Sequence, residues 1–459
     1  MKRWWAVMCL GWAVGATAAP LSMEDAWQRL LAEDEQLAAG AAAQQRAASM
    51  VDAHVSLLLP QIDLVGSVTH LEHPVELDAL ALDPLQRLAD TPVGQALVNY
   101  VGGEDWFVTP VTRRNVVRSS LVALWPLYTG GKIKAAGELA RLGQEEARAL
   151  LAEMQRLRFV SLVAAYYGAV SADRVTDTLD TTANTLDEHA RAARAREAQQ
   201  QLAPLERMAI EVAYEEAALN ARSAAQKRDN VLVALRSMVH EDGIVEPVSP
   251  LFIHRDVPPL AQLLAGLDDH PALAVLAAKR GQAQTLARAS RGQYHPNVFL
   301  YGSHQVYQNN DFAKELTPDW YVGLGVRMPL LDRSGRRHTT QAADAAVDEA
   351  GHLYNATRRK LAVLLERQHN EVTQALSQFD SLAHSIGLAE EALHLQQRAF
   401  AEGLSRSIDV LDAQNAVTAA RTRQQLAATR YVLALSELLT LAGRQDLFFE
   451  FMREGEPVL

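Results

Sequence analysis

The longest pattern of hydrophobic positions in the chain is a heptad repeat in its second half. An apolar residue recurs at every seventh position, at Leu365, Val372, Phe379, Ile386, Leu393 and Phe400. A strict repeat of seven keeps one apolar stripe against neighbouring helices and predicts a left-handed coiled coil. No proline interrupts residues 330–402. The pattern therefore predicts a helix over about 336–402, roughly 100 Å long at about 1.5 Å per residue.

A second long helix is predicted over about 132–200, where the sequence again contains no proline. Each long helix ends in a short break, and a return helix follows each break, over about 205–239 and 407–441. The residues at the two breaks are therefore predicted to form the tips of two helical hairpins. These tip residues are Leu202, Pro204, Gly403, Leu404 and Ser405.

Four segments of about ten residues are predicted to be β-strands, and in the first of them apolar and polar residues alternate with the period of two that is typical of strands. They cover residues 60–70, 117–127, 297–307 and 320–330. Strands of about 9–11 residues are long enough to cross a bilayer when they are tilted. The second strand of each pair leads into its long helix through a predicted strand-to-helix turn. The candidate turn residues are Pro126, Gly130, Gly131, Pro329 and Gly335.

Matching positions indicate that the chain is internally duplicated. Pro60 lies 236 residues before Pro296, and Pro126 lies 203 residues before Pro329. The break at Gln201 matches Gly403 with an offset of 202. The change from 236 to 203 makes the first inter-strand loop 33 residues longer than the second, and a short helix is predicted in it near 85–100.

The predicted organisation has five parts. Residues 1–18 form a signal peptide and 19–239 the first structural repeat, which opens with one helix over about 22–55. Residues 240–259 form a linker without a clear period. Residues 260–441 form the second repeat, whose first helix continues past Pro271. Residues 442–459 form a C-terminal tail without a pattern.

This order of elements predicts an α+β membrane protein with four β-strands per protomer. Four strands cannot close a membrane barrel alone, because open sheet edges leave backbone N–H and C=O groups unpaired in lipid. Three chains would supply twelve strands, an even number as membrane barrels require. We therefore expect a trimeric 12-stranded β-barrel continued by a long periplasmic α-helical coiled-coil barrel. The alternative is a soluble helical protein with two ordinary hairpins.

The N-terminus is typical of a secretory signal peptide. Lys2 and Arg3 precede a short apolar run, and Ala16-Thr17-Ala18 is a typical cleavage site, so the mature chain is expected to start at Ala19. The single cysteine, Cys9, lies within this segment. The mature protein is therefore expected to contain no disulfide and no thiolate metal site.

Composition argues against several classes of function. The net charge of −11 and the absence of a clustered basic stripe argue against a nucleic-acid-binding surface. The sequence contains neither an HExxH nor a GxSxG motif, so we expect no enzyme activity and no cofactor. His70, Glu72 and His73 could suggest a metal site, but solvated residues at a loop end are the better interpretation, and no metal is expected.

Several motifs together resemble the TolC-like outer-membrane efflux proteins, over roughly residues 21–443. Each motif is weak alone, but their order and duplication make the set specific. The motifs are Leu59-Pro60-Gln61, Trp125-Pro126-Leu127-Tyr128-Thr129-Gly130-Gly131, Tyr294-His295-Pro296, Met328-Pro329-Leu330 and the segment from Gly403 to Ala413, which reads GLSRSIDVLDA.

The resemblance implies a homotrimer in the outer membrane of a Gram-negative bacterium, in contact with lipid and with a large periplasmic portion. Members of this family serve as exit ducts of tripartite efflux pumps, together with a periplasmic adaptor protein and an inner-membrane transporter of the RND or ABC type. We expect the export of small toxic compounds. The alternatives are an outer-membrane duct for type I protein secretion and, with less support, a periplasmic coiled-coil scaffold without a pore.

The resemblance also implies a periplasmic constriction, or gate, near the second tip. Asp409 and Asp412 match acidic positions of the family, and they share a helical face because they are three residues apart. Rings of carboxylates in a narrow pore attract cations. The alternative is that an Asp in a first helical turn only complements the helix dipole. Phe400 stands where a hydrogen-bonding tyrosine is common, and Arg406 is a candidate partner of the aspartates.

The first tip departs from the family pattern. It lacks the usual glycine, and Arg207 stands where an aspartate is common. Arg207 is therefore a second candidate partner of the aspartates.

Overall fold

The computed structural model describes residues 19–101, 108–241, 243–309, 318–330 and 335–458. The predicted signal peptide lies outside the described residues. The chain divides into two units. The core unit comprises the described residues of 1–45, 145–279 and 350–459, and the sheet unit comprises those of 46–144 and 280–349. Within the described ranges, no helix combines the length and the apolar character that a membrane span requires.

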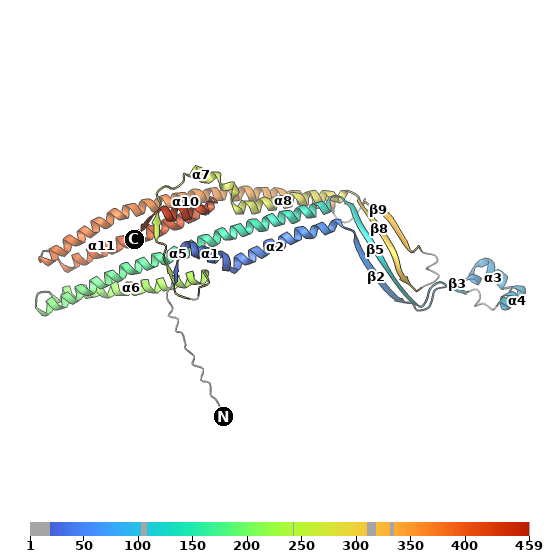
Figure 1. Ribbon diagram of the computed structural model, residues 1–459, viewed down its shortest axis with the longest axis horizontal. Helices are drawn as coiled ribbons and strands as arrows, with labels where there is room; N and C mark the ends of the chain where they lie inside the picture. Colours follow the sequence, from blue (N-terminus) through green and yellow to red (C-terminus); the bar gives the residue numbers. More distant parts are fainter. Residues whose placement is uncertain (1–18, 102–107, 242, 310–317, 331–334, 459) are drawn as a thin grey trace, which may run out of the picture. The chain divides into compact units, whose positions relative to one another are not determined.

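The sheet unit contains one four-stranded antiparallel sheet in the order β2-β5-β8-β9 (Figure 1). The strands are β2 (Gln61–His70), β5 (Asn115–Thr129), β8 (Asn297–Gln308) and β9 (Trp320–Arg327). Each lies within three residues of its predicted bounds. The pairing of β5 with β8 joins the two repeats in one sheet. The sheet is open, with β2 and β9 as its edges among the described residues, so closure by three chains stays a prediction.

One face of this sheet is apolar and exposed. Pairing places Leu64 opposite Leu121 and Leu300 opposite Leu324, and the register between β5 and β8 puts all four side chains on one face. The exposed apolar residues of this face, called the apolar face below, are Ile62, Leu64, Val68, Leu121, Trp125, Val322, Leu324 and Val326. The opposite face carries most of the polar side chains, namely Asp63, Ser67, Arg118, Ser120 and Ser303.

The long loop between β2 and β5 contains two short helices where one was predicted. They are α3 (Asp83–Ala89) and α4 (Pro92–Val101), preceded by the 3-10 turn at Ala79–Ala81. Proline starts α4 because its fixed φ angle suits a first helical position. The strands β3 (Glu76–Asp78) and β4 (Val108–Pro110) pair with each other and close the loop at its base.

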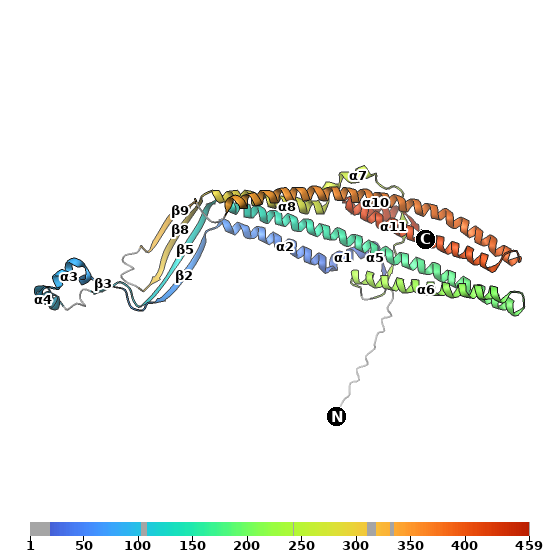
Figure 2. The same ribbon diagram turned by 180° about the vertical axis from the view of Figure 1, so that it is seen from behind.

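The two predicted long helices are confirmed. They are α5 (Lys132–Ala198) with 67 residues and α10 (Arg336–Ala401) with 66 residues. The return helices α6 (Pro204–Met238) and α11 (Ser407–Leu441) each have 35 residues. Figures 1 and 2 show α6 running back beside α5, and α11 running back beside α10. These pairs are the two predicted hairpins.

The prediction of one N-terminal helix over 22–55 is wrong, because two helices meet at Asp34. They are α1 (Met23–Glu33) and α2 (Glu35–Val55), followed by the 3-10 turn Ser56–Leu58. Asp34 has an extended ψ of 116°, and its carboxylate accepts a 2.9 Å hydrogen bond from the Leu37 N–H. The same carboxylate pairs with Arg158 on α5. Asp34 therefore ends one helix and caps the next, which periodicity alone does not reveal.

The helix predicted from residue 260 past Pro271 is likewise divided. It consists of α7 (Leu260–Ala265), the 3-10 turn Leu267–Asp269 and α8 (Pro271–Arg291), which continues into the turn Gly292–Tyr294. The buried imidazole of His270 accepts a 3.1 Å hydrogen bond at Nδ1 from the Ala272 N–H. This bond caps α8, while Pro271 takes the first helical position.

The linker and the tail, for which the sequence shows no period, form short strands and a helix. In the linker, β6 (Val245–Pro247) pairs in parallel with β1 (Ala19–Leu21), and β7 (Leu251–Ile253) pairs with β10 (Glu456–Val458) of the tail. The tail also forms the helix α12 (Gln445–Glu454). The four strands have three residues each and are too short to show a period, and apolar residues of the strands and of α12 are buried in the main core.

The main core lies in the core unit and is rich in aromatic contacts. Phe159 on α5 is fully buried and packs edge-on against Trp27, Phe448 and Phe449, with ring centroids 5.1, 5.4 and 5.6 Å away. The Tyr166 hydroxyl donates to the Leu21 carbonyl at 2.7 Å and accepts from the Ser249 N–H at 2.8 Å. The core therefore joins the N-terminal strand, α5, the linker and the C-terminal tail.

Corresponding helix ends of the two hairpins lie 203 residues apart in the sequence. Residues with positive φ follow all four hairpin helices, namely Gln200 (61°), His240 (51°), Gly403 (77°) and Gly443 (70°). Each is followed by a hydrogen bond from the next N–H to a carbonyl five residues earlier, from 201 to 196, 241 to 236, 404 to 399 and 444 to 439. This is the Schellman helix end. The predicted tip offset of 202 is wrong by one residue, because Gln200 and not Gln201 matches Gly403.

Candidate functional site

The second hairpin tip begins where α10 ends at Gly403. Glycine adopts the positive φ of this position without a steric cost, and the following Leu404 is 79% exposed. The Ser405 hydroxyl then donates a 2.9 Å hydrogen bond to Gln396 Oε1. The predicted break is therefore a tight, hydrogen-bonded turn between α10 and α11.

Asp409 is held by the start of its own helix. Its Oδ2 accepts a 3.1 Å hydrogen bond from the Arg406 N–H, and its Oδ1 accepts one of 3.1 Å from Arg406 Nη2. The hydrogen bond from the Arg406 side chain, followed by the one from the Arg406 backbone, holds the pKa of Asp409 below its ordinary value. The predicted pairing of Arg406 with an aspartate is present, and it makes Asp409 a helix cap.

Asp412 differs from Asp409 although both were predicted to act together. Its side chain is exposed, and among the described residues it forms no hydrogen bond and no ion pair. A spacing of three residues places both carboxylates on the same helical face. It does not reveal which of them accepts hydrogen bonds from the first residues of the helix. Asp412 is therefore the carboxylate that remains open to a cation in solution.

At the first tip, Arg207 has other partners than the aspartates. Its guanidinium pairs with Glu197 at 2.6 Å and with Glu211, and Glu211 also accepts a 2.7 Å hydrogen bond from Arg194. Pro204 takes the first position of α6, as its missing N–H allows. The hypothesis that Arg207 pairs with Asp409 or Asp412 is wrong within this chain, because the charges of the first hairpin satisfy one another.

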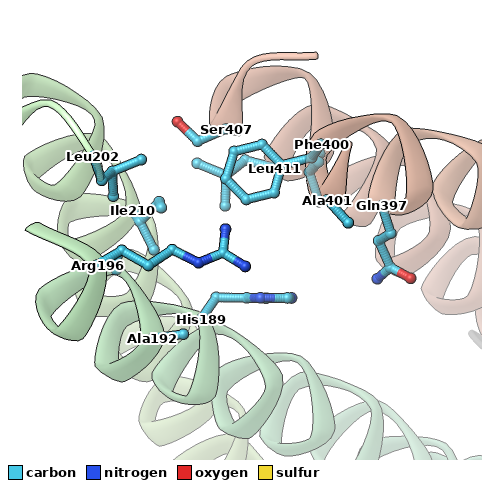
Figure 3. Close-up of a pocket in the computed structure, with 12 residues that line it drawn as sticks. His189, Ala192, Arg196, Leu202, Ile210, Gln397, Phe400, Ala401, Ser407 and Leu411 are labelled. Carbon is cyan, nitrogen blue, oxygen red and sulfur yellow. The ribbon is translucent and has the colours of Figure 1, made fainter. Parts of the chain in front are cut away.

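A cavity of about 200 Å³ lies between the two hairpin tips (Figure 3). Its apolar wall includes Leu202, Ile210, Phe400 and Leu411. Figure 3 shows the Arg196 side chain reaching from α5 toward Phe400, and its guanidinium carbon lies 5.6 Å from the centre of that ring. The contact joins the ends of α5 and α10.

Sequence reasoning missed Arg196 and His189, which also lines this cavity. The heptad pattern singles out Phe400 but cannot say which residue of a helix 200 positions earlier faces it. The mismatch of Phe400 with the family's tyrosine was the signal available, because an aromatic ring that cannot donate a hydrogen bond can still attract a cation.

The predicted strand-to-helix turns are tight at their glycines. Gly130 (φ 63°), Gly131 (83°) and Gly335 (60°) adopt backbone conformations that other residues rarely take. A Cβ atom on Gly130 would lie 2.4 Å from the Gly292 carbonyl oxygen, so no side chain fits there. In the second turn, Arg336 Nη1 donates to the Pro329 carbonyl at 3.0 Å. Pro126 lies in β5 at an irregularity of its pairing with β8.

The weak metal interpretation near the end of β2 gains no support. His70 Nδ1 lies 2.6 Å from Asn115 Oδ1 on the neighbouring strand, so this nitrogen has a protein partner. Within the described residues, no group of three or more His, Cys, Asp and Glu side chains is arranged to hold a metal ion.

The chain is similar to known outer-membrane efflux proteins. Residues 265–444 match the family described as outer membrane efflux protein. The cobalt-zinc-cadmium resistance protein CzcC of Cupriavidus metallidurans is 24% identical over 327 residues, which cover 68% of this chain and 74% of CzcC.

Two solved structures share the fold. The outer membrane channel CmeC of Campylobacter jejuni matches with a TM-score of 0.75 and 15% identity, over 92% of this chain and 86% of CmeC. The outer membrane protein VceC of Vibrio cholerae matches with a TM-score of 0.75 and 14% identity, over 92% of this chain and 96% of VceC. The predicted outer-membrane location is confirmed at the level of the family. Residues 265–444 therefore match the outer membrane efflux protein family, and the chain as a whole shares the fold of solved TolC-like outer-membrane channels.

Proposed function

We propose that the protein is the outer-membrane exit duct of a tripartite efflux pump and that it works as a homotrimer. The observation that carries the proposal is the apolar face of the sheet. Leu64 in β2 and Leu324 in β9 expose 67% and 62% of their surface, although both lie in the middle of a strand. A soluble protein would cover such a face, whereas a membrane barrel turns it toward lipid.

The open edges of the sheet support an assembly of three chains. β2 and β9 each have one side without a strand partner among the described residues. In lipid these edges would leave backbone groups unpaired at a cost of several kcal/mol each. Pairing β9 of one chain with β2 of the next satisfies both edges, and three chains give the twelve strands of a closed barrel.

The heptad stripe of α10 supports the same assembly. Leu365 and Val372 are fully buried within the chain, whereas the later positions from Phe379 to Phe400 are only half-buried. The stripe therefore continues beyond the part that one chain covers. Helices of neighbouring chains would cover the rest and extend the barrel as a periplasmic coiled-coil tube.

Passage through this duct is passive, and the energy for transport comes from partners. The turn Tyr128-Thr129-Gly130-Gly131-Lys132 lacks the glycine spacing of a phosphate-binding loop. A periplasmic adaptor and an inner-membrane transporter of the RND or ABC type would supply the driving force. The similarity to a metal-resistance protein favours efflux over type I protein secretion.

The proposed substrates are metal cations such as those of cobalt, zinc and cadmium, the three metals named in the description of CzcC. Asp412 suits such a cargo, because three copies of an unpaired carboxylate in a narrow pore would lower the energy of a passing cation. Asp409 is already paired with Arg406 and would contribute less.

Deleting the gene tests the duct and its substrates together. The deletion strain should become more sensitive to cobalt, zinc and cadmium salts, and the wild-type gene should restore resistance. The purified protein should leave the outer membrane only with detergent and run as a heat-modifiable trimer. A soluble monomer would contradict the duct, whereas unchanged metal resistance with an intact trimer would contradict only the metal substrates.

Single-channel conductance tests the role of the carboxylate at the tip. Asp412→Asn should lower the preference for cations over anions, whereas Asp409→Asn should change it less because Arg406 already offsets that charge. Equal cation preference in wild type and Asp412→Asn would contradict the acidic ring.

A further inference from the structure

The cavity between the two hairpin tips has the features of a ligand site. Its walls come from α5, α6, α10 and α11, and most of its lining is apolar. Four of its lining residues have polar side chains, namely Arg196, His189, Gln397 and Ser407. Figure 3 shows Arg196 and His189 projecting from the first hairpin toward the second. No Asp or Glu lines the cavity, although the chain as a whole has a net charge of −11.

Arg196 differs from the other arginines of its hairpin end. Arg191 pairs with Asp187, Arg194 pairs with Glu211, and Arg207 pairs with Glu197 and Glu211. Within the described part of the chain, Arg196 has no carboxylate partner, and its guanidinium lies over the Phe400 ring. This cation–π contact uses none of the guanidinium N–H groups, so they can donate to a ligand.

The size of the cavity limits the ligand. An apolar cavity on the order of 150 Å³ in another protein holds one benzene molecule. The volume here is about 200 Å³, which leaves room for one ring and a small polar group. Drug-sized ligands usually occupy about 300–1,000 Å³, which is more than this cavity holds.

We propose that this cavity binds a small aromatic carboxylate. The carboxylate takes the position in front of Arg196, where a planar guanidinium can donate two parallel hydrogen bonds. The imidazole of His189 lies within the same lining and supplies a further donor. The ring of the ligand lies against Leu202, Ile210 and Leu411. Because these walls belong to both hairpins, a bound molecule links the two tips of one chain.

Benzoate is the probe for this site. Binding to the detergent-solubilised full-length mature protein is measured by isothermal titration calorimetry and by saturation-transfer NMR. We expect saturable binding that Arg196→Gln weakens by at least about tenfold, because hydrogen bonds between charged groups contribute more than neutral ones. Arg194→Gln is the matched control, since that guanidinium engages Glu211 and does not line the cavity, and it should bind benzoate like the wild type.

Benzyl alcohol tests whether the cavity recognises the carboxylate or only the apolar ring of the ligand. It has the same ring but no charge, so it should bind at least about tenfold more weakly than benzoate. Equal affinity for the two probes would overturn the proposal, as would the absence of saturable benzoate binding by a folded, trimeric wild type. Equal loss of binding in the Arg194 and Arg196 variants would also overturn it, because the effect would then not come from the cavity.

Discussion

Four residues with positive φ define the ends of the hairpin helices. Gly403 and Gly443 hold the two positions of the second repeat, and Gln200 and His240 hold those of the first. The hydrogen bonds that follow them are the same in both repeats. A side chain in the left-handed region costs about 1–2 kcal/mol, which glycine avoids. The first repeat therefore forms the same turns at a higher conformational energy.

Replacing Gln200 by glycine should stabilise the protein. The relief of about 1–2 kcal/mol is offset by the greater freedom of glycine in the unfolded chain, about 0.5–1 kcal/mol. A net gain of about 0.5–1 kcal/mol in the free energy of unfolding is expected from denaturant titration of the detergent-solubilised protein. Gly403→Ala should lower the same quantity by a similar amount. Destabilisation by Gln200→Gly would contradict the strain.

The ion pair at the second tip should make its stability depend on pH. Arg406 lowers the pKa of Asp409 below its ordinary value of 3.8, so the charged carboxylate favours the folded chain. This contribution is present above pH 3.8 and is lost as the pH falls through the lowered pKa. The thermal midpoint of Asp409→Asn should lie below that of the wild type at pH 7, and the difference should shrink toward pH 3.

Asp412→Asn is the control for this pH dependence. Asp412 has no ion pair among the described residues, so its replacement should leave the thermal midpoint unchanged at both pH values. A difference between wild type and Asp409→Asn that stays constant from pH 7 to pH 3 would show that the carboxylate charge is not the cause.

At the scale of elements, the strands could be predicted because alternation is a local pattern. The long helices were equally clear from their length without proline. The break at Asp34 and the three-residue strands were not, because their causes lie elsewhere in the fold. Asp34 ends a helix with the help of Arg158, which is 124 residues away, and β7 is stabilised by burial in the core rather than by its own sequence.

A charge on the apolar face should prevent assembly. Leu324→Lys places an ammonium group in the middle of β9, where a lipid-facing lysine costs about 2–4 kcal/mol. The yield of heat-modifiable trimer from outer membranes should fall strongly. Ser303→Lys is the matched control on the opposite face of the neighbouring strand β8, and it should assemble normally. Loss of trimer in the control alone would mean that the two faces are assigned the wrong way round.

At the scale of the whole molecule, the main core is assembled from segments far apart in sequence. The tail contributes Phe448, which is fully buried and packs edge-on against Phe159 of α5 and Phe252 of the linker, with centroid distances of 5.4 and 5.6 Å. A tail and a linker without any pattern are thus tied to the longest helix of the first repeat. The tail is part of the folding unit.

Truncating this ring should therefore destabilise the protein. Phe448→Ala removes a fully buried aromatic side chain and is expected to cost about 3–5 kcal/mol in the free energy of unfolding. Leu404→Ala is the control, because Leu404 is 79% exposed at the second tip and its loss should change little. A cost below about 1 kcal/mol for Phe448→Ala would mean that the tail packs only loosely.

The candidate site could be predicted in outline but not in detail. The break near Gly403 and the shared face of Asp409 and Asp412 follow from local sequence. The different states of the two carboxylates depend on the position of the Arg406 side chain, and the contact of Arg196 with Phe400 depends on how two hairpins lie together. Neither arrangement produces a periodic pattern in the sequence, so neither could be predicted without the three-dimensional structure.

The turn at Gln200 also has a dynamic consequence. The turns at Gln200 and Gly403 have the same hydrogen bonds, but only the turn at Gln200 is strained. Because local unfolding releases this strain, the turn at Gln200 should open more often. Backbone amides of residues 197–203 should therefore exchange with solvent deuterium several-fold faster than those of 400–406. The two hairpin tips have the same hydrogen bonds, yet the tip of the first repeat should open more often than the tip of the second.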